Sequence, residues 1–465
     1  MFSAFQTFGR LGAGGLPFSE RALWPQSASS PGLWIDPSYT ASEFQNSAGT
    51  TALSTIGTVL DSSNPVGLML DRKGGLVLGP ELVTNGDFSG GSTGWTAGAG
   101  WSISSSAAAS AASGQLTQSG VCSSSKYYKV TLTASVASGY AVIYLGNGAS
   151  GTINVSDSLT FYLHSGSSGS TLTVYSFSLT GSIDNISVRE IPGIHLSQST
   201  SPARPVASAR KNLLVGTATL STQSVTVKAI PHTITFSGGG TVTASDAYVG
   251  ALTNGQTFTP SAGTLTLTVS GSVTSAQLEH GSAATTYQAV VSASDYTAAG
   301  FPVYLKLDGT DDGLAGATFP AGTFTSSMDC LIALRRDSTS NTVVGLYNAV
   351  ADATKYFGMA ESGSSSGCVG SGAGTPTVWV DGVQLTGGTA VTRGTLHTAL
   401  TAGAWHIVEF RGLDLSTWTA VGHGLYTSYV RNGALGKIAL FASGQDANRD
   451  KARARMAAYF GVTLP

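Results

Sequence analysis

Apolar and polar residues alternate with a period of two along much of this chain, which is the pattern of β-strands with one buried face. The stretch from Val303 to Phe319, VYLKLDGTDDGLAGATF, begins with apolar Val303, Leu305 and Leu307 at every second position. The carboxylates and glycines of DGTDDG supply the side-chain hydrogen bonds and positive-φ positions of a tight reversal. We therefore predict a strand, a turn and a second strand here.

Similar strings recur at short intervals on both sides of this stretch. They include KYYKVTLTASV, GYAVIYLG, DSLTFYLHSG, STLTVYSFSLTG, GTLTLTVSG, MDCLIALRR and AWHIVEFRGL. Each is bounded by Gly, Ser or Asp, as the strands of an antiparallel sandwich are. The predicted fold class is all-β, with antiparallel β-sandwiches in series.

One stretch has a helical period instead. In SGQDANRDKARARMAAYFGVTLP, near the C-terminus, Ala452, Met456 and Phe460 recur every four residues. Ser443 or Asp446 can cap the helix. Its basic residues are expected to face solvent for the most part; they are Arg449, Lys451, Arg453 and Arg455.

Changes in composition divide the chain into five parts. Proline and arginine gather between two strand-rich regions, in IPGIHLSQSTSPARPVASARKN, which has the composition of a linker. We predict an N-terminal attachment segment at 1–80, a sandwich at 81–192, a linker at 193–211, a small sandwich at 212–295 and a terminal sandwich at 296–465.

Composition narrows the functional classes. Charged residues make up only 10% of the 465 residues, 60 are glycine, and the hydrophobic share is 42%, which is enough to build cores. A net charge of −2 gives no basic field for nucleic acid, and no apolar run reaches the length of a membrane span. No signal peptide is recognised at the N-terminus. The cysteines, Cys122, Cys330 and Cys368, lack metal-ligand spacing; Cys330 and Cys368 could pair, and buried free thiols are the preferred interpretation.

Four strings resemble known families. LDGTDDG resembles the opening strand of concanavalin-A-like and laminin-G-like lectin domains, and ELVTNGDFSGGSTGWT resembles the first strands of carbohydrate-binding modules of families 4 and 9. LWIDPS and its neighbours resemble a segment of bacteriophage virion proteins, and SAQLEHGSAATTYQAV resembles a motif that precedes lectin-like domains in those proteins. The resemblance implies a jelly-roll first sandwich and a C-terminal lectin-like sandwich. In SIDNISVREI it implies that Ile183, Ile186 and Val188 face inward around a turn or bulge.

The same resemblance suggests candidate binding residues. Aromatic side chains stack on sugar rings in these modules, and the candidates are Trp101, Tyr127, Tyr140 and Trp418; Trp95 is expected to fill the core instead. The Asp308, Asp311 and Asp312 carboxylates offer hard oxygen ligands for Ca²⁺, although turn formation alone explains them and no cofactor is required. Virion attachment is assigned to the aromatic residues of the N-terminus, Phe2, Phe5, Phe8, Phe18 and Trp24.

No catalytic constellation is recognised in the sequence. The seven histidines are scattered, the nearest carboxylate pair is Glu409 with Asp414, and the adjacent residues Glu279 and His280 point to opposite faces of a strand. We therefore expect a non-enzymatic virion protein, a fibre, spike or decoration subunit. Its expected partners are capsid, neck or tail proteins, further copies of itself, with a trimer favoured, and host surface polysaccharide. The alternatives are a purely structural decoration protein, a polysaccharide depolymerase and a bacterial surface adhesin.

Overall fold

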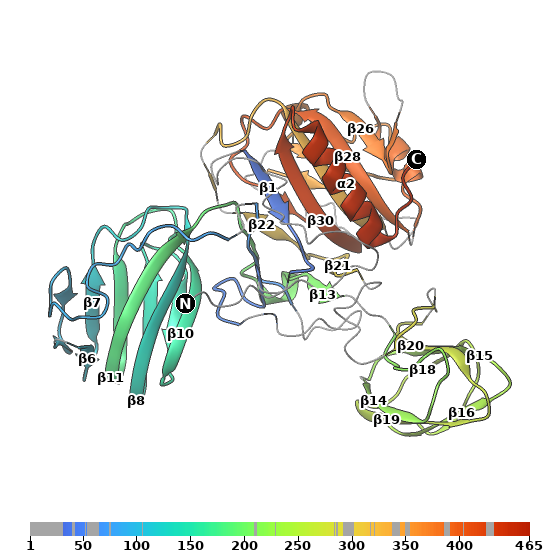
Figure 1. Ribbon diagram of the computed structural model, residues 1–465, viewed down its shortest axis with the longest axis horizontal. Helices are drawn as coiled ribbons and strands as arrows, with labels where there is room; N and C mark the ends of the chain where they lie inside the picture. The colour runs from blue at the N-terminus through green and yellow to red at the C-terminus, as the bar shows by residue number, and fades with distance from the viewer. Residues whose placement is uncertain are drawn as a thin grey trace. The chain divides into compact units, whose positions relative to one another are not determined.

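The structure is a computed structural model. It describes residues 31–39, 42–51, 53, 65–73, 76–104, 106–208, 212–227, 229–282, 284, 287–291, 302–316, 318–319, 321–336, 345–348, 354–385, 391–402, 404–424 and 432–465. The all-β prediction is confirmed: the described residues form antiparallel sheets with two α-helices, one of them C-terminal (Figure 1). Within the described part of the chain, neither helix has the length and apolar composition needed to cross a membrane.

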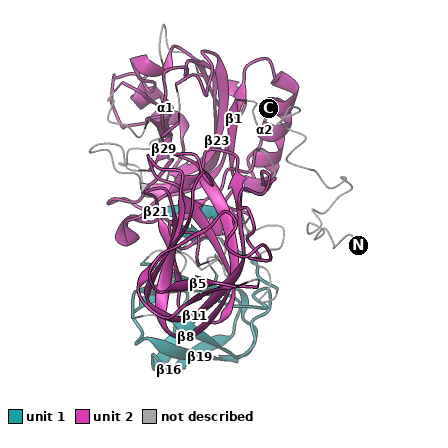
Figure 2. Cartoon of the chain, turned by 90° about the vertical axis from the view of Figure 1, so that its left-hand side faces the viewer, with its two compact units in different colours: residues 1–18, 54–64, 206–306 teal, residues 19–53, 65–205, 307–465 magenta. Residues whose placement is uncertain are grey.

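The chain divides into two compact units (Figure 2). Described residues between Val206 and Lys306 belong to the first, and those within Ser19–Leu53, Pro65–Pro205 and Leu307–Pro465 belong to the second. The second unit therefore contains both the first predicted sandwich and most of the terminal one.

The first sandwich is built around two long neighbouring strands, β8 (Tyr127–Leu145) and β11 (Leu172–Ile191). In the half that contains Tyr127 and Ile191, β10 pairs with β8, and β6 pairs with β11 and is followed by β5. In the half that contains Leu145 and Leu172, β9 pairs with β8, and β7 pairs with β11 and is followed by β4. The shorter strands are β4 (Thr96–Ala97), β5 (Trp101–Ile103), β6 (Ala108–Ser110), β7 (Gly114–Gln118), β9 (Ser150–Ile153) and β10 (Asp157–His164).

Bulges bend the long ribbon between its two halves. The β8–β11 register shifts between Phe177 and Thr180, where Gly139 has φ of 70° and a Cβ atom would lie 2.1 Å from the Ser178 carbonyl oxygen. The register shifts again between Thr180 and Gly181 and after Asp184, where Asn185 has φ of 53°. Only glycine fits the first position without moving backbone. The predicted bulge in SIDNISVREI is thus confirmed, and the predicted inward residues are buried, namely Ile183, Ile186 and Val188.

The first unit contains a small two-sheet sandwich. One sheet has the order β14-β19-β16-β17 and the other β18-β15-β20, and both contribute to a single apolar core that includes Leu265 and Leu267. The strands are β14 (Gln223–Val227), β15 (His232–Ser237), β16 (Thr241–Asp246), β17 (Gly250–Leu252), β18 (Gln256–Phe258), β19 (Gly263–Ser270) and β20 (Thr274–His280). In the same unit, β13 (Val206–Ser208) pairs with the start of β21 (Tyr304–Asp308).

The terminal sandwich has two sheets that recruit strands from distant parts of the chain. One runs β1-β30-β23-β28-β26-β27 and the other β2-β3-β12-β22-β29-β24-β25. The strands of the first are β1 (Gly32–Ile35), β23 (Met328–Arg336), β26 (Thr377–Val380), β27 (Val383–Gln384), β28 (Trp405–Leu413) and β30 (Asn432–Ala442). Those of the second are β2 (Glu43–Phe44), β3 (Leu68–Met69), β12 (Leu196–Ser197), β22 (Leu314–Gly316), β24 (Leu346–Tyr347), β25 (Tyr356–Phe357) and β29 (Gly422–His423).

This topology differs from the predicted boundaries. Residues 31–80 were expected to be a separate attachment segment and 193–211 a linker, yet β1, β2, β3 and β12 complete the terminal sandwich, so residues 81–191 are an insertion in it. The buried Asp71 carboxylate joins these segments, because it accepts hydrogen bonds from the backbone N–H groups of Trp34 (2.9 Å), Lys73 (2.9 Å) and Ile194 (3.0 Å).

The predicted C-terminal helix is α2 (Asp446–Phe460), which packs on β23, β28 and β30 (Figure 1). Its expected apolar residues, Ala452, Met456 and Phe460, are buried. Gln445 is its N-cap and makes no side-chain capping bond, so neither predicted capping residue is used. A short second helix, α1 (Arg393–Ala399), was not predicted.

Arg449 on α2 is buried, contrary to the expectation that the basic residues face solvent for the most part. Its guanidinium forms ion pairs with Asp329 of β23 at 2.8 Å and with Glu409 of β28 at 2.9 Å. Glu409 is also paired with Arg411 at 2.5 Å and Arg453 at 3.0 Å. The helix is therefore held to its sheet by a buried charge cluster as well as by an apolar stripe.

Candidate functional site

Three aromatic rings form a cluster on the first sandwich. Tyr140 of β8 and Phe177 of β11 are stacked, with ring centroids 4.9 Å apart and planes 14° from parallel, and Tyr175 lies 4.6 Å from Phe177. Tyr140 is 41% and Phe177 42% exposed. The exposed parts of these rings offer apolar aromatic surface to a ligand with an apolar face. We call Tyr140, Phe177 and Tyr175 the ring cluster.

Strand register explains why these rings meet. Tyr140 is the direct cross-strand partner of Phe177, and Val142 is that of Tyr175. Directly paired residues of antiparallel strands project to the same face, and alternate residues share that face. The intervening residues, such as Ala141 and Ser176, are buried on the opposite face. The ring cluster therefore belongs to the outer face of the sheet.

Of the four predicted sugar-stacking residues, only Tyr140 is exposed. Trp101 is buried in the sandwich core and donates its Nε1–H to the Gly114 carbonyl at 3.1 Å. Trp418 is fully buried and donates to the Gly372 carbonyl at 3.0 Å. Trp101, Tyr127 and Trp418 thus lack the exposed ring face that stacking on a sugar requires, while Trp95 is buried against Phe88 as predicted.

Tyr127 is buried between two histidines where the sandwich meets the N-terminal strands. Its ring centroid lies 4.9 Å from those of His164 and His195, and it shares an apolar cluster with Phe44 and Leu68. Burial lowers the pKa of His164, an effect to which His195 adds, and burial likewise lowers the pKa of His195 against the opposing effect of its bond with the Ile191 carbonyl. Folding therefore favours the neutral form of both rings.

These two histidines predict a loss of stability in acid. The pKa of histidine in the unfolded chain is 6.5, and folding lowers the pKa of these two residues. Below pH 6.5 the unfolded chain therefore binds more protons than the folded one, so the free energy of unfolding falls as the pH falls. We expect thermal unfolding midpoints to fall between pH 7 and about pH 5. The fall should be smaller in a His164→Gln, His195→Gln double variant, and equal slopes in the two proteins would contradict this assignment.

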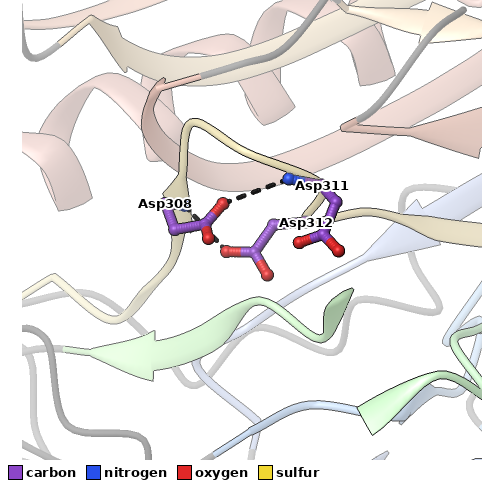
Figure 3. Close-up of side chains that lie close together, drawn as sticks. All are labelled: Asp308, Asp311 and Asp312. Carbon is purple, nitrogen blue, oxygen red and sulfur yellow. Dashed lines mark hydrogen bonds between the residues drawn. The ribbon is translucent and has the colours of Figure 1, made fainter. Parts of the chain in front are cut away.

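The three aspartates of the predicted calcium turn do come together (Figure 3). Carboxylate oxygens of Asp308, Asp311 and Asp312 lie within 4.8 Å of one another. Within the turn, Asp308 accepts backbone hydrogen bonds from Thr310 at 2.7 Å and Asp311 at 3.4 Å, and Asp312 accepts one from Asp308 at 2.7 Å. The donor set suits Ca²⁺ chemically, but these bonds also give the aspartates a role in forming the turn.

The carboxylate pair considered for hydrolysis is placed differently from a glycosidase pair. Glu409 is buried and paired with three arginines, while Asp414 accepts hydrogen bonds from the backbone and hydroxyl of Ser416. A general acid or nucleophile has to reach the scissile bond, and Glu409 lies beneath α2. Glu279 and His280 are both buried in β20 of the small sandwich.

Two further predictions concern the cysteines and the N-terminus. Cys122, Cys330 and Cys368 are buried free thiols, as preferred from the sequence, so Cys330 and Cys368 do not pair. Burial raises the pKa of Cys368 to about 12, and this thiol is therefore protonated at neutral pH. The aromatic residues assigned to virion attachment lie outside the described residues; they are Phe2, Phe5, Phe8, Phe18 and Trp24.

No family model matches this chain, and no curated protein matches it at a significant level.

Sequence reasoning missed Phe177 and Tyr175. Both lie in the predicted strand STLTVYSFSLTG, where they occupy alternate positions and so share a face. What the sequence does not give is the partner strand and its register. The sequence does offer one signal: residues 88–125 and 130–156 contain no Asp, Glu, Lys or Arg. The strands in these ranges therefore expose a surface without charged side chains.

Proposed function

We propose that this chain is a bacteriophage or prophage virion protein, a fibre, spike or decoration subunit that attaches to a glycan on the host surface without making or breaking a bond. It is assembled in the host cytoplasm, displayed on the particle and oligomeric, with a trimer favoured. The proposal requires no cofactor, although the Asp308 turn is where a Ca²⁺ ion would be held. The families that the sequence strings resemble supply the virion assignment.

The observation that carries the attachment role is the exposed ring cluster. A pyranose presents an apolar C–H face, and the exposed aromatic surface of Tyr140 and Phe177 is suited to contact it. An isolated site of this kind binds weakly. Many copies on one particle gain avidity without new contacts, which suits reversible attachment.

Binding of the fluorescently labelled full chain to intact host cells tests the attachment role. Tyr140→Leu and Phe177→Leu are expected to lower binding at least several-fold, because each removes a ring and keeps apolar bulk. Val383→Ala is the matched control, since Val383 is an exposed apolar residue of the terminal sandwich. Binding of the unaltered chain that is no greater than that of a non-binding protein of similar size would refute attachment.

The purely structural alternative makes a different prediction for the same surface. If the sandwiches contact only neighbouring virion subunits, the unaltered free chain should not bind cells. The leucine variants should then reduce incorporation of the chain into particles. The depolymerase alternative requires release of reducing ends from host polysaccharide. The pairing of Glu409 with three arginines speaks against that residue as its acid.

A further inference from the structure

Among the residues that the structure describes, those of the outer face around the ring cluster are uncharged as well as aromatic. Beside the rings, β8 contributes Val142 and Tyr144 to this face. Neighbouring strands extend it with hydroxyl and amide side chains at cross-strand positions; these are Ser150 and Thr152 of β9, Gln115 and Thr117 of β7, and Thr96 of β4. We call this surface, including the ring cluster, the outer ring face.

Sequence extends this lack of charge beyond the strands themselves. Residues 88–125 and 130–156 contain no Asp, Glu, Lys or Arg. Within 158–183, His164 is the one titratable residue apart from tyrosines. His164 pairs with Tyr127 at the opposite end of the ribbon. The loops that connect the strands of the outer ring face therefore bring no cation to it.

The charged residues of β8, β10 and β11 lie in the half of the ribbon away from the rings. Lys129 pairs with Arg189 and lies 11 positions before Tyr140, which at about 3.3 Å per residue is a path of about 35 Å along the strand. The formal charges nearest to the rings along the ribbon are carboxylates: Asp157 pairs with Ala134 and Asp184 with Thr133. Such carboxylates repel a polyanion instead of attracting it.

We infer that the outer ring face binds a neutral polysaccharide and discriminates against acidic glycans such as uronic-acid or phosphate-bearing polymers. Stacking on Tyr140 and Phe177 uses the C–H face of a pyranose, and the flanking threonine, serine and glutamine side chains suit its hydroxyl groups. Anionic polymers are recognised through lysine or arginine, which this face lacks. The inference rests on the proposed attachment function and names its ligand class.

Affinity electrophoresis of the full chain tests the inference with matched polymers. Neutral gels contain hydroxyethylcellulose, xyloglucan, dextran or mannan, and anionic gels contain carboxymethylcellulose, alginate or poly(glycerol phosphate). We expect retardation by at least one neutral polymer, none by the anionic ones, and little change when about 0.5 M NaCl is added, because screening acts on charge and not on stacking. Carboxymethylcellulose and hydroxyethylcellulose share a backbone, so this pair isolates the effect of charge.

Variants assign the binding to this face. Tyr140→Leu and Phe177→Leu should each weaken retardation roughly threefold to tenfold, the range expected for the loss of one aromatic contact, while Tyr140→Phe, which keeps the ring, should not. Circular dichroism and the unfolding midpoint check that the leucine variants remain folded.

Retardation by none of the neutral polymers would overturn the inference, and so would salt-sensitive retardation by the anionic polymers. It would also be overturned if the leucine variants changed only the sedimentation of the chain, because the rings would then serve contact between copies of the chain. Cell binding separates this failure from that of the attachment function. If the unaltered chain binds cells and the leucine variants bind equally well, attachment stands through another surface and only the inference fails.

Discussion

Replacing Arg449 with alanine is expected to destabilise the terminal sandwich by about 3–5 kcal/mol, the cost of breaking a buried ion pair from one side. The Arg449 side chain is 6% exposed, and its loss leaves Asp329 without its buried cation and Glu409 with only two of three. Both carboxylates are themselves buried, at 6% and 1% exposure of the side chain. We also expect faster hydrogen exchange over 446–460, because Arg449 is the residue of α2 that pairs with both β23 and β28.

Lys451 provides the matched control for this experiment. It is exposed on the same helix, and Lys451→Ala should change the unfolding free energy by less than about 0.5 kcal/mol. Arg449→Met keeps much of the side-chain volume and removes the charge, so it separates packing from electrostatics. A loss in Arg449→Ala no larger than in Lys451→Ala would show that the charge cluster adds nothing to the docking of α2.

This cluster also shows what sequence reasoning could and could not find in α2. The helix was predicted because its apolar residues repeat every four positions, which is information local to one segment. The burial of Arg449 depends on Asp329, 120 positions away in the chain, and on Glu409 in another strand. An arginine on a helix is normally solvated, and only its partners across the fold reverse that expectation.

The topology was missed for a related reason. Strands of two to four residues, such as β1, β2, β3 and β12, are too short to show a period, and prolines around them suggested a tether. Their place in the terminal sandwich comes from pairing across the chain: Trp34 in β1 is opposite Ala439 in β30. The strand content was local and predictable, whereas the partner of each strand was not.

The same distinction applies to the candidate site. Adjacent strand residues face opposite ways, yet Tyr127 and Tyr128 are both buried. Tyr128 lies in the sandwich core, while Tyr127 is covered by Phe44 and Leu68 from the N-terminal strands. Residue type alone made Tyr127 a candidate, and the covering segment, contributed by a distant part of the sequence, removes it.

Trp418 was predicted to stack on a sugar, whereas in the structure it is fully buried. Its ring centroid lies 5.7 Å from that of Phe357 in β25, and Phe357 lies 5.2 Å from Phe410 in β28, so these aromatic side chains connect the two sheets of the terminal sandwich. Trp418→Ala is expected to cost about 3–5 kcal/mol through the cavity it creates. Chemical denaturation monitored by circular dichroism measures this loss.

Trp418→Phe refines the test, because it keeps most of the ring and removes the hydrogen bond to the Gly372 carbonyl. Leaving that buried acceptor unpaired should cost about 1–3 kcal/mol, less than the alanine variant loses. Glycan binding by folded Trp418→Phe should equal that of the unaltered chain, since a fully buried ring touches no ligand. If Trp418→Phe kept the free energy of unfolding of the unaltered chain and lost glycan binding, Trp418 would have to contact the ligand, which its burial contradicts.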